Sequence, residues 1–169
     1  MEKLIYLDGL PAYKVLPMRE DHLAEVEAIE RKSFPHPWSR GIFEAEARNV
    51  SGVSRPFVLA ASDGRVAGYL CTWNVSNELH VNNIAVAPEL RGRGLGWALL
   101  EFAEERARAW GCRVMLLEVR TSNDAAARLY KRFGFSELGV RRHYYQETGE
   151  DAVVMTKTLN RPDKDRTKP

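Results

Sequence analysis

The residues with the clearest chemical purpose lie in the run IAVAPELRGRGLGW, from Ile84 to Trp97. Alternate glycines after a short apolar strand free the backbone to turn its N–H groups around an anion, and the helical pattern behind them points its positive end at the same place. Two arginines add positive charge. The loop consists of Arg91, Gly92, Arg93, Gly94, Leu95 and Gly96. This combination predicts a cradle for a pyrophosphate group.

Spacing disfavours two common phosphate-binding motifs. A P-loop requires a lysine followed by serine or threonine after its last glycine, where this chain has Trp97 and Ala98. A dinucleotide fingerprint requires a third glycine at the position of Trp97 or Leu99. A glycine-rich turn whose arginines are merely solvated stays open as the plain structural alternative.

The elements that position this loop follow from the periodicity of the apolar residues. Strands are expected near 13–16, 56–62, 65–75, 79–86, 113–119, 137–145 and 152–159, and helices over 19–32, 39–49, 95–109 and 123–132. Ser39 should cap the second helix while Trp38 packs on Phe43, and Asp63-Gly64 should form a hairpin turn. This order predicts an α/β (α+β) domain with a single mixed, mostly antiparallel central sheet flanked by helices.

Length and composition limit the classes of protein to consider. The 169 residues suit one domain at 13–159, between an N-terminal extension at 1–12 and a charged tail at 160–169 that we expect to be disordered. The formal net charge of +2 resides in that tail, so the neutral body argues against direct binding of nucleic acid. No signal peptide or long apolar run is evident, which predicts a cytoplasmic protein without a membrane partner.

Two motifs, in the same order along the chain, resemble the signatures of the GNAT N-acetyltransferase family. They read Arg91-x-x-Gly94-x-Gly96 and Asn123-x-x-Ala126-x-x-x-Tyr130-x-x-x-Gly134-Phe135. The resemblance covers about residues 14–158. It implies the GNAT fold, acetyl-CoA as co-substrate, no metal, and direct transfer of the acetyl group to an amine in a ternary complex.

Four further runs are similar to the RimI branch of this family. They are FPHPWS at 34–39, LEVRTSNDAAARLY at 117–130, RRHYY at 141–145 and EDAVVM at 150–155. That branch acetylates the N-terminal alanine of the eighteenth protein of the small ribosomal subunit, so the resemblance implies a protein N-terminus as acceptor and a ribosomal protein as partner. Broader N-terminal, lysine or small-amine specificity stays open, as does a non-catalytic partner protein that binds coenzyme A.

Acetyl transfer to an amine needs a base for the ammonium group and an acid for the leaving thiolate. Glu118 is the candidate base, because desolvation within the apolar run RVMLLEV would raise its pKa and the family's base falls on this position. Tyr130 is the candidate acid, because a phenol is protonated at neutral pH and the family's tyrosine coincides with it. Without the motif, Glu118 would be a paired carboxylate and Tyr130 a packing residue.

The resemblance also assigns residues to the coenzyme. Backbone groups of Ile84 and Val86 would hold the pantetheine and the acetyl carbonyl, and Asn123 would contact the coenzyme. The whole predicted coenzyme-binding set is Ile84, Ala85, Val86, Arg91, Gly92, Arg93, Gly94, Leu95, Gly96, Trp97 and Asn123.

The acceptor is expected in a groove walled by aromatic residues. If the resemblance to the RimI branch holds, the walls are Pro37, Trp38, Tyr144 and Tyr145. A hydrophobic staple and an ordinary aromatic hairpin explain these side chains equally well.

Five other polar residues are left without a catalytic role. Glu78 and His80 could assist the base, but a histidine before a strand is more often structural, and His36 is assigned no role. Cys71 and Cys112 are expected to be inert core thiols, because neither has a recognisable histidine partner.

Overall fold

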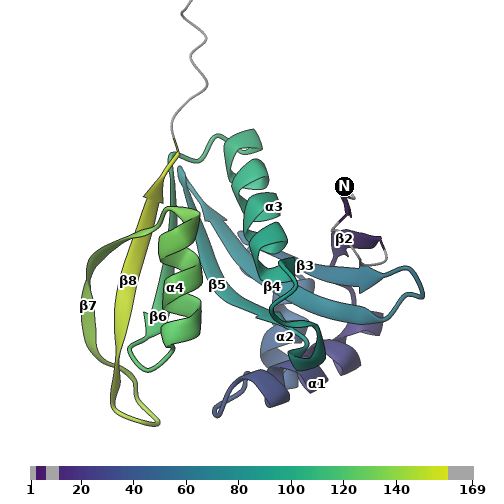
Figure 1. Cartoon of the computed structure of the whole chain (residues 1–169), viewed down its shortest axis with the longest axis horizontal. Coiled ribbons are helices and arrows are strands. Elements are labelled where there is room, and N and C mark those ends of the chain that lie inside the picture. Colours follow the sequence, from purple (N-terminus) through teal and green to yellow (C-terminus); the bar gives the residue numbers. More distant parts are fainter. Residues whose placement is uncertain (1–2, 7–11, 160–169) are drawn as a thin grey trace, which may run out of the picture. The chain divides into compact units, whose positions relative to one another are not determined.

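The computed structural model describes residues 3–6 and 12–159, which form eight strands and four α-helices (Figure 1). In chain order the elements are β1 (Lys3–Ile5), β2 (Tyr13–Pro17), the 3-10 turn η1 (Glu20–His22), α1 (Leu23–Ser33), α2 (Arg40–Ala47), β3 (Ser54–Ala61), β4 (Val66–Val75), β5 (Glu78–Val86), the 3-10 turn η2 (Pro88–Leu90), α3 (Leu95–Ala109), β6 (Val114–Arg120), α4 (Asp124–Phe133), β7 (Ser136–Tyr145) and β8 (Glu150–Thr158). None of the helices in the described part of the chain is long and apolar enough to cross a membrane. The predicted tail and most of the predicted extension, residues 1–2 and 7–11, lie outside the described residues.

The strands form one eight-stranded sheet in the order β1-β2-β3-β4-β5-β6-β8-β7. Five neighbouring pairs are antiparallel: β1·β2, β2·β3, β3·β4, β6·β8 and β7·β8. Strands β5 and β6, which α3 connects, begin side by side, since the N–H of Arg113 donates to the carbonyl of Asn77 at 2.7 Å. The predicted fold class, a single mixed and mostly antiparallel sheet flanked by helices, is confirmed.

The chain divides into two compact units, and the first comprises Met1–Trp73 and Val81–Ala103. Its helices α1 and α2 cover one face of β3 and β4, where Phe43 packs against Tyr69 with ring centroids 5.4 Å apart. Helix α3 lies on the other face, where Phe102 packs on Phe57 at 4.8 Å. Side chains alternate between the two faces along a strand, so Val58 packs into the core under α1 and α2 while its neighbour Phe57 packs against α3.

Gly68 allows β4 to approach the end of β5, the strand that leads into the glycine loop. A Cβ at this position would lie 2.7 Å from the carbonyl oxygen of Ala85 and 3.3 Å from the Cα of Val86. The N–H of Ala87 then donates to the carbonyl of Ala67 at 2.9 Å. This close contact fixes where β5 ends and the loop begins.

The second unit comprises Asn74–His80 and Glu104–Pro169 and is built on β6, β8 and β7. Figure 1 shows α4 beside these three strands. Its aromatic side chains form a cluster in which Phe135 lies 6.0 Å from Tyr130 and 6.3 Å from Phe133, measured between ring centroids. The ammonium of Lys157 on β8 links this core to two helices, because it contacts Glu104 of α3 at 2.5 Å and donates to the carbonyl of Phe133 of α4 at 2.8 Å.

Several predictions about single elements are confirmed. Helix α3 spans the predicted range, Leu95–Ala109. The turn at Asp63-Gly64 joins β3 to β4, and Gly64 has a φ of 88° there. Trp38 packs on Phe43 with ring centroids 5.5 Å apart, as the staple before α2 requires.

Other predictions about elements were wrong in detail. The helix expected from residue 19 begins as an α-helix only at Leu23, after the turn η1. Ser39 occupies the N-cap position of α2 but makes no capping hydrogen bond through its side chain, and α2 ends at Ala47, two residues before the predicted end. In β6, which contains most of the apolar run RVMLLEV, the residues alternate between buried and half-buried, and Glu118 lies on the half-buried face.

Candidate active site

The glycine loop between β5 and α3 has the backbone geometry that anion binding requires. Gly92 and Gly94 have φ values of 73° and 83°, a left-handed conformation that suits glycine. The N–H of Ala98 donates to the carbonyl of Gly94 at 3.0 Å, so the N–H groups of Leu95 and Gly96 precede the first bond of α3 and point out of its N-terminus. The loop therefore presents backbone donors and the positive end of a fifteen-residue helix together.

Arg91 fixes the loop to its surroundings. Its Nε donates to the carbonyl of Val86 at 3.1 Å, and its Nη2 donates to the hydroxyl of Ser33 at 2.7 Å. Both acceptors are neutral, so these bonds hold the guanidinium without cancelling its charge. Arg91 thus ties the loop to the end of β5 and to the last residue of α1.

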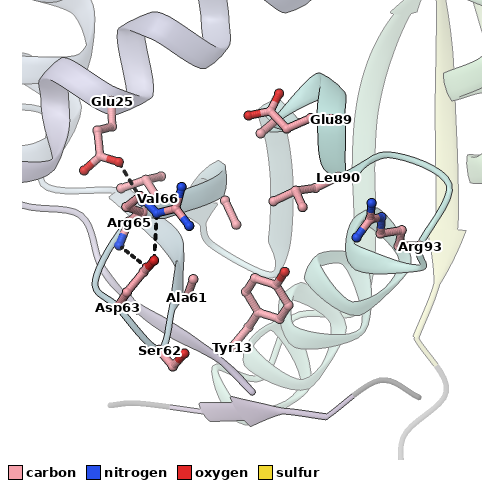
Figure 2. Close-up of a pocket in the computed structure, with 12 residues that line it drawn as sticks. Tyr13, Glu25, Ala61, Ser62, Asp63, Arg65, Val66, Glu89, Leu90 and Arg93 are labelled. Atoms are coloured by element: carbon pink, nitrogen blue, oxygen red, sulfur yellow. Dashed lines mark hydrogen bonds and ion pairs between the residues drawn. The ribbon is translucent and has the colours of Figure 1, made fainter. Parts of the chain in front are cut away.

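Arg93 faces a cavity of about 360 Å³ in the first unit (Figure 2). Figure 2 shows Tyr13 pointing into the cavity from below and Glu89 and Leu90 of η2 above it. Three other charged lining residues have partners: Glu25 accepts from the N–H of Val66 at 2.9 Å, and Arg65 contacts Asp63 at 2.7 Å. The cavity therefore opens beside the loop.

Apart from Asn123, the remaining residues of the predicted coenzyme set lie where β5 meets the loop and where α3 begins. Ala85, Val86 and Leu95 are buried, whereas Ile84, Gly96 and Trp97 are half-buried. The indole of Trp97 donates to Glu101 at 2.8 Å. Asn123 belongs to the second unit and caps α4, because its side-chain oxygen accepts from the N–H of Ala126 at 3.2 Å.

Glu118 lies on the face of β6 whose residues are half-buried. Its side chain is 21% exposed, and its Oε1 lies 3.3 Å from the Nη1 of Arg141 on β7. The paired-carboxylate alternative therefore describes its resting contacts. A carboxylate that the acceptor can reach is able to accept its proton.

Tyr130 lies on α4 with 7% of its surface exposed. Burial raises the pKa of its phenol well above the ordinary value of 10, and the neighbouring Tyr145 raises it further. Tyr130 is therefore protonated throughout the neutral pH range and can donate its proton but cannot lose it to water.

Tyr145 is the member of the predicted acceptor wall that is held most firmly. The guanidinium of Arg120 stacks on its ring 3.6 Å from the centroid, and the ring of Tyr144 meets it edge-on at 5.1 Å. Burial raises the pKa of Tyr145 to about 12, against the opposing effect of Arg120, and Glu118 is among the charges that raise it. Within the second unit, Tyr145 therefore interacts electrostatically with both Tyr130 and Glu118.

Arg120 is in turn held by carboxylates. It contacts Glu147 at 2.5 Å and Glu150 at 3.3 Å. Hydrogen bonds from Ser122, with others from Arg120 and Thr121, lower the pKa of Glu150 to about 2. These contacts fix the turn between β7 and β8 against the end of β6.

The loop that carries Pro37 and Trp38 is anchored by a residue that sequence reasoning missed. Glu30 on α1 is 1% exposed and accepts from the backbone N–H of Trp38 at 2.7 Å. It also accepts from the hydroxyl of Tyr69 and from the amide of Asn83 at 3.2 Å. Pro37 is exposed and Trp38 half-buried on this anchor.

A second buried acid, Glu46 of α2, also escaped prediction. It is 7% exposed, binds the hydroxyl of Ser54 and accepts from the indole of Trp73 at 2.9 Å. Both glutamates occupy apolar helix faces with polar partners from distant strands. The signal available in the sequence was an acid at a position of the buried stripe, since Glu30 falls one helical turn after Val26 and two after Leu23, both of which are buried.

The remaining candidates have plain structural surroundings. Cys71 and Cys112 are free and buried, and burial raises the pKa of both thiols, as expected for unreactive cysteines. His80 contacts Glu78 at 2.9 Å. Among the described residues there is no group of histidines, cysteines and carboxylates that could hold a metal ion.

Several known proteins are similar to this chain in sequence and in fold. A model of the acetyltransferase (GNAT) family matches residues 23–135, a range that contains both the glycine loop and Tyr130. A protein of Bacillus subtilis (strain 168) is 38% identical over 143 residues, which is 85% of this chain and 93% of that protein.

Two further similarities come from Escherichia coli. The ribosomal protein bS18-alanine N-acetyltransferase of strain K12 is 39% identical over 129 residues, 75% of this chain and 84% of that protein. The crystal structure of the ribosomal-protein-S18-alanine N-acetyltransferase from E. coli aligns with a TM-score of 0.79 and 30% identity, covering 92% of this chain and 99% of that one.

Proposed function

This chain belongs to the acetyltransferase (GNAT) family and is an acetyl-CoA-dependent N-acetyltransferase; on that premise we propose that its acceptor is the N-terminal alanine of ribosomal protein bS18. The observation that carries the proposal is the similarity to the E. coli enzyme of that name, at 39% identity over 75% of this chain. With a ribosomal protein as acceptor, we further propose that the reaction takes place in the cytoplasm.

The glycine loop supports the coenzyme's role in this proposal. The residues present fit a pyrophosphate, because the N-terminus of α3, the left-handed Gly92 and Gly94, and the cations Arg91 and Arg93 meet in one loop. Bound there, acetyl-CoA would supply the acetyl thioester. Backbone groups of Ile84 and Val86, at the end of β5, would align its pantetheine arm.

Glu118 is the proposed base. An α-ammonium group with a pKa near 8 needs only a modest base at neutral pH. The side chain of Glu118 is 21% exposed, so its carboxylate can be reached by the acceptor and can receive this proton. The N–H bond of the acceptor breaks as an O–H bond forms on Glu118, and the neutral amine can then attack.

Tyr130 is the proposed acid. Its buried phenol stays protonated at neutral pH, since burial and Tyr145 both raise its pKa. The O–H bond of Tyr130 breaks as the S–H bond of coenzyme A forms, and the second proton that the acceptor nitrogen loses on becoming an amide restores the phenol. Pro37 and Trp38 in the first unit, and Tyr144 and Tyr145 in the second, are the side chains proposed to contact the acceptor peptide.

The test is thiol release from acetyl-CoA with three short peptides. One copies the N-terminus of bS18 with a free α-amine, the second is the same peptide with a blocked N-terminus, and the third offers only a lysine ε-amine. We expect release with the first peptide alone, and mass spectrometry should place the acetyl group on the α-amine.

The controls separate the parts of the proposal. Release with the lysine peptide would replace an N-terminal acceptor by a broader one. Silence with all three peptides, while acetyl-CoA binding persists by calorimetry, would refute bS18 as the acceptor and leave the family membership intact.

A further inference from the structure

Arg141 occupies the place beside Glu118 that an incoming ammonium group would need. Its Nη1 lies 3.3 Å from the Oε1 of Glu118, in a pair whose side chains are 57% and 21% exposed, respectively. The two residues come from different strands, β7 and β6. The proposed base is therefore paired with a cation of this chain before any acceptor arrives.

The register of the three strands explains the pairing. Glu118 of β6 lies opposite Val154 of β8, which lies opposite Gly139 of β7. Two residues further along β6, Arg120 lies opposite Ala152, which lies opposite Arg141. Directly opposed residues share a face, so Arg141 and Glu118 point to the same side and meet diagonally across β8. Gly139 leaves the row of Glu118 open, because a Cβ there would meet nothing within 4 Å.

Arg120, which lies on the same face of the sheet, already has two carboxylate partners. Arg120 contacts Glu147 and Glu150 and stacks on Tyr145. Arg141 has an exposed side chain and a second contact, since its guanidinium lies 5.5 Å from the ring centroid of Tyr144. Of these two cations, Arg141 is the one that can leave its carboxylate without breaking a buried network.

We propose that Arg141 is an exchangeable counter-ion of Glu118, which the α-ammonium group of the acceptor displaces as it binds. The inference rests on the proposed role of Glu118. Arg141 keeps its own proton and takes no part in the transfer, during which one proton passes from the acceptor nitrogen to Glu118. The displaced guanidinium remains over the ring of Tyr144, at the wall proposed for the acceptor.

Competition predicts the direction of the effect of removing Arg141. Without its competitor the acceptor should bind more tightly, so Arg141→Gln should lower the KM for the acceptor peptide about two- to fivefold and change kcat less. The upper limit corresponds to about 1 kcal/mol, the usual worth of an exposed ion pair. Arg141→Lys keeps a cation at this position and should return KM toward the wild-type value.

Arg142→Gln is the matched control. Arg142 is the next residue of β7, carries the same charge and contacts Asp151 at 2.8 Å instead of Glu118. Its replacement should leave the KM for the acceptor unchanged. In the background of Glu118→Gln, replacement of Arg141 should no longer lower KM, because its effect acts through the carboxylate. Thermal melting of each variant reports whether the fold is retained.

A second measurement does not depend on turnover or on the identity of the acceptor. The carboxyl carbon-13 resonance of Glu118, assigned with Glu118→Gln, is followed during titration with propylammonium chloride against a potassium chloride control. Half-saturation should occur at a lower concentration in Arg141→Gln than in the wild type. Equal half-saturation, or a KM that rises when Arg141 is removed, would overturn the proposal even if bS18 proves to be the acceptor.

Discussion

At the scale of single residues, the proposed division of labour between Glu118 and Tyr130 depends on their contrasting surroundings. Glu118 is partly exposed and ion-paired, whereas Tyr130 is buried and protonated. A carboxylate that the acceptor can reach and a phenol whose pKa is raised by burial can serve as base and acid, respectively. This contrast leads to a kinetic prediction for each residue.

Glu118→Gln and Tyr130→Phe should each lower kcat by about 10²- to 10⁴-fold, the usual contribution of general acid–base catalysis, with acetyl-CoA affinity nearly unchanged. The defect of Glu118→Gln should shrink as pH rises past about 8, because the acceptor amine then loses its proton without help. Steady-state kinetics across pH and calorimetric titration with acetyl-CoA measure both.

Glu137→Gln is the control for this experiment, since Glu137 lies on β7 of the same unit in an exposed pair with Lys131 of α4. Full activity of both test variants would remove Glu118 and Tyr130 from the proposed mechanism.

Asn82 on β5 supports a prediction about stability. The amide nitrogen of its side chain is buried and has no hydrogen-bond partner among the described residues. A buried donor without a partner costs about 1–3 kcal/mol, so Asn82→Leu should raise the free energy of unfolding by about 1 kcal/mol. Urea unfolding measures the change.

Asn83 is the matched comparison because its amide donates to Glu30 at 3.2 Å. Asn83→Leu should destabilise the protein, since Glu30 and Tyr69 each lose a partner. If both replacements changed stability in the same direction, the missing partner of Asn82 would not be the cause.

At the scale of elements, the loop between α1 and α2 depends on one buried side chain. Glu30 binds the N–H of Trp38, the hydroxyl of Tyr69 and the amide of Asn83. Glu30→Gln turns one acceptor oxygen into a donor that faces other donors. We expect a loss of about 2–3 kcal/mol of unfolding free energy and a higher KM for the acceptor, because Trp38 loses its anchor.

Glu20→Gln provides the comparison for Glu30. Glu20 is an exposed partner of Arg48, at 2.8 Å, and an exposed ion pair is worth about 0–1 kcal/mol. Chemical denaturation should therefore separate the two glutamates clearly. A loss for Glu30→Gln no larger than that for Glu20→Gln would show that the buried network does not hold the loop.

The elements also show what the sequence could and could not predict. Helix α3 and the turn at Asp63-Gly64 were predictable because their signals are local: a 3.6-residue apolar repeat and a dipeptide suited to a turn. The exposure of Glu118 was not predictable, because it depends on which distant parts of the chain cover each face of β6. Arg141, the partner of Glu118, is separated from it by 23 positions and by a strand register that no local pattern encodes.

The site residues divide in the same way. Motif spacing sufficed to select the loop from Arg91 to Gly96, and the structure gives it left-handed glycines at the N-terminus of α3. The polar partners of the acids Glu30 and Glu46 could not be recognised, since they lie on β3, β4 and β5, far away in the sequence. The sequence thus predicts elements and motifs better than it predicts the environment of a carboxylate.

At the scale of the whole molecule, the proposed roles are divided between the two compact units. The glycine loop and the loop of Trp38 belong to the first unit, whereas Glu118, Tyr130 and the tyrosines of β7 belong to the second. The second unit holds its hairpin together through carboxylates, among them Glu104, Glu150 and Asp151, whose pKa values are all lowered. Its stability should therefore respond to acid.

Glu150 is the residue at which the effect of acid on folding stability can be tested. Hydrogen bonds from Ser122 lower its pKa in the folded protein to about 2, from an ordinary value of 4.5. Between these two pH values the unfolded chain binds more protons than the folded protein, so stability rises with pH. The contribution of Glu150 is complete above about pH 4.5 and is lost as pH falls toward about 2.

Thermal melting between pH 2 and pH 6 should therefore show a melting temperature that falls on acidification, with a smaller fall in Glu150→Gln. The variant should melt below the wild type at pH 6 and approach it at pH 2, because only the wild type has a paired carboxylate to lose. Glu89→Gln, an exposed acid on η2, should keep the wild-type slope. Equal slopes for Glu150→Gln and the wild type would mean that the contacts of Glu150 with Arg120, Thr121 and Ser122 do not stabilise the fold.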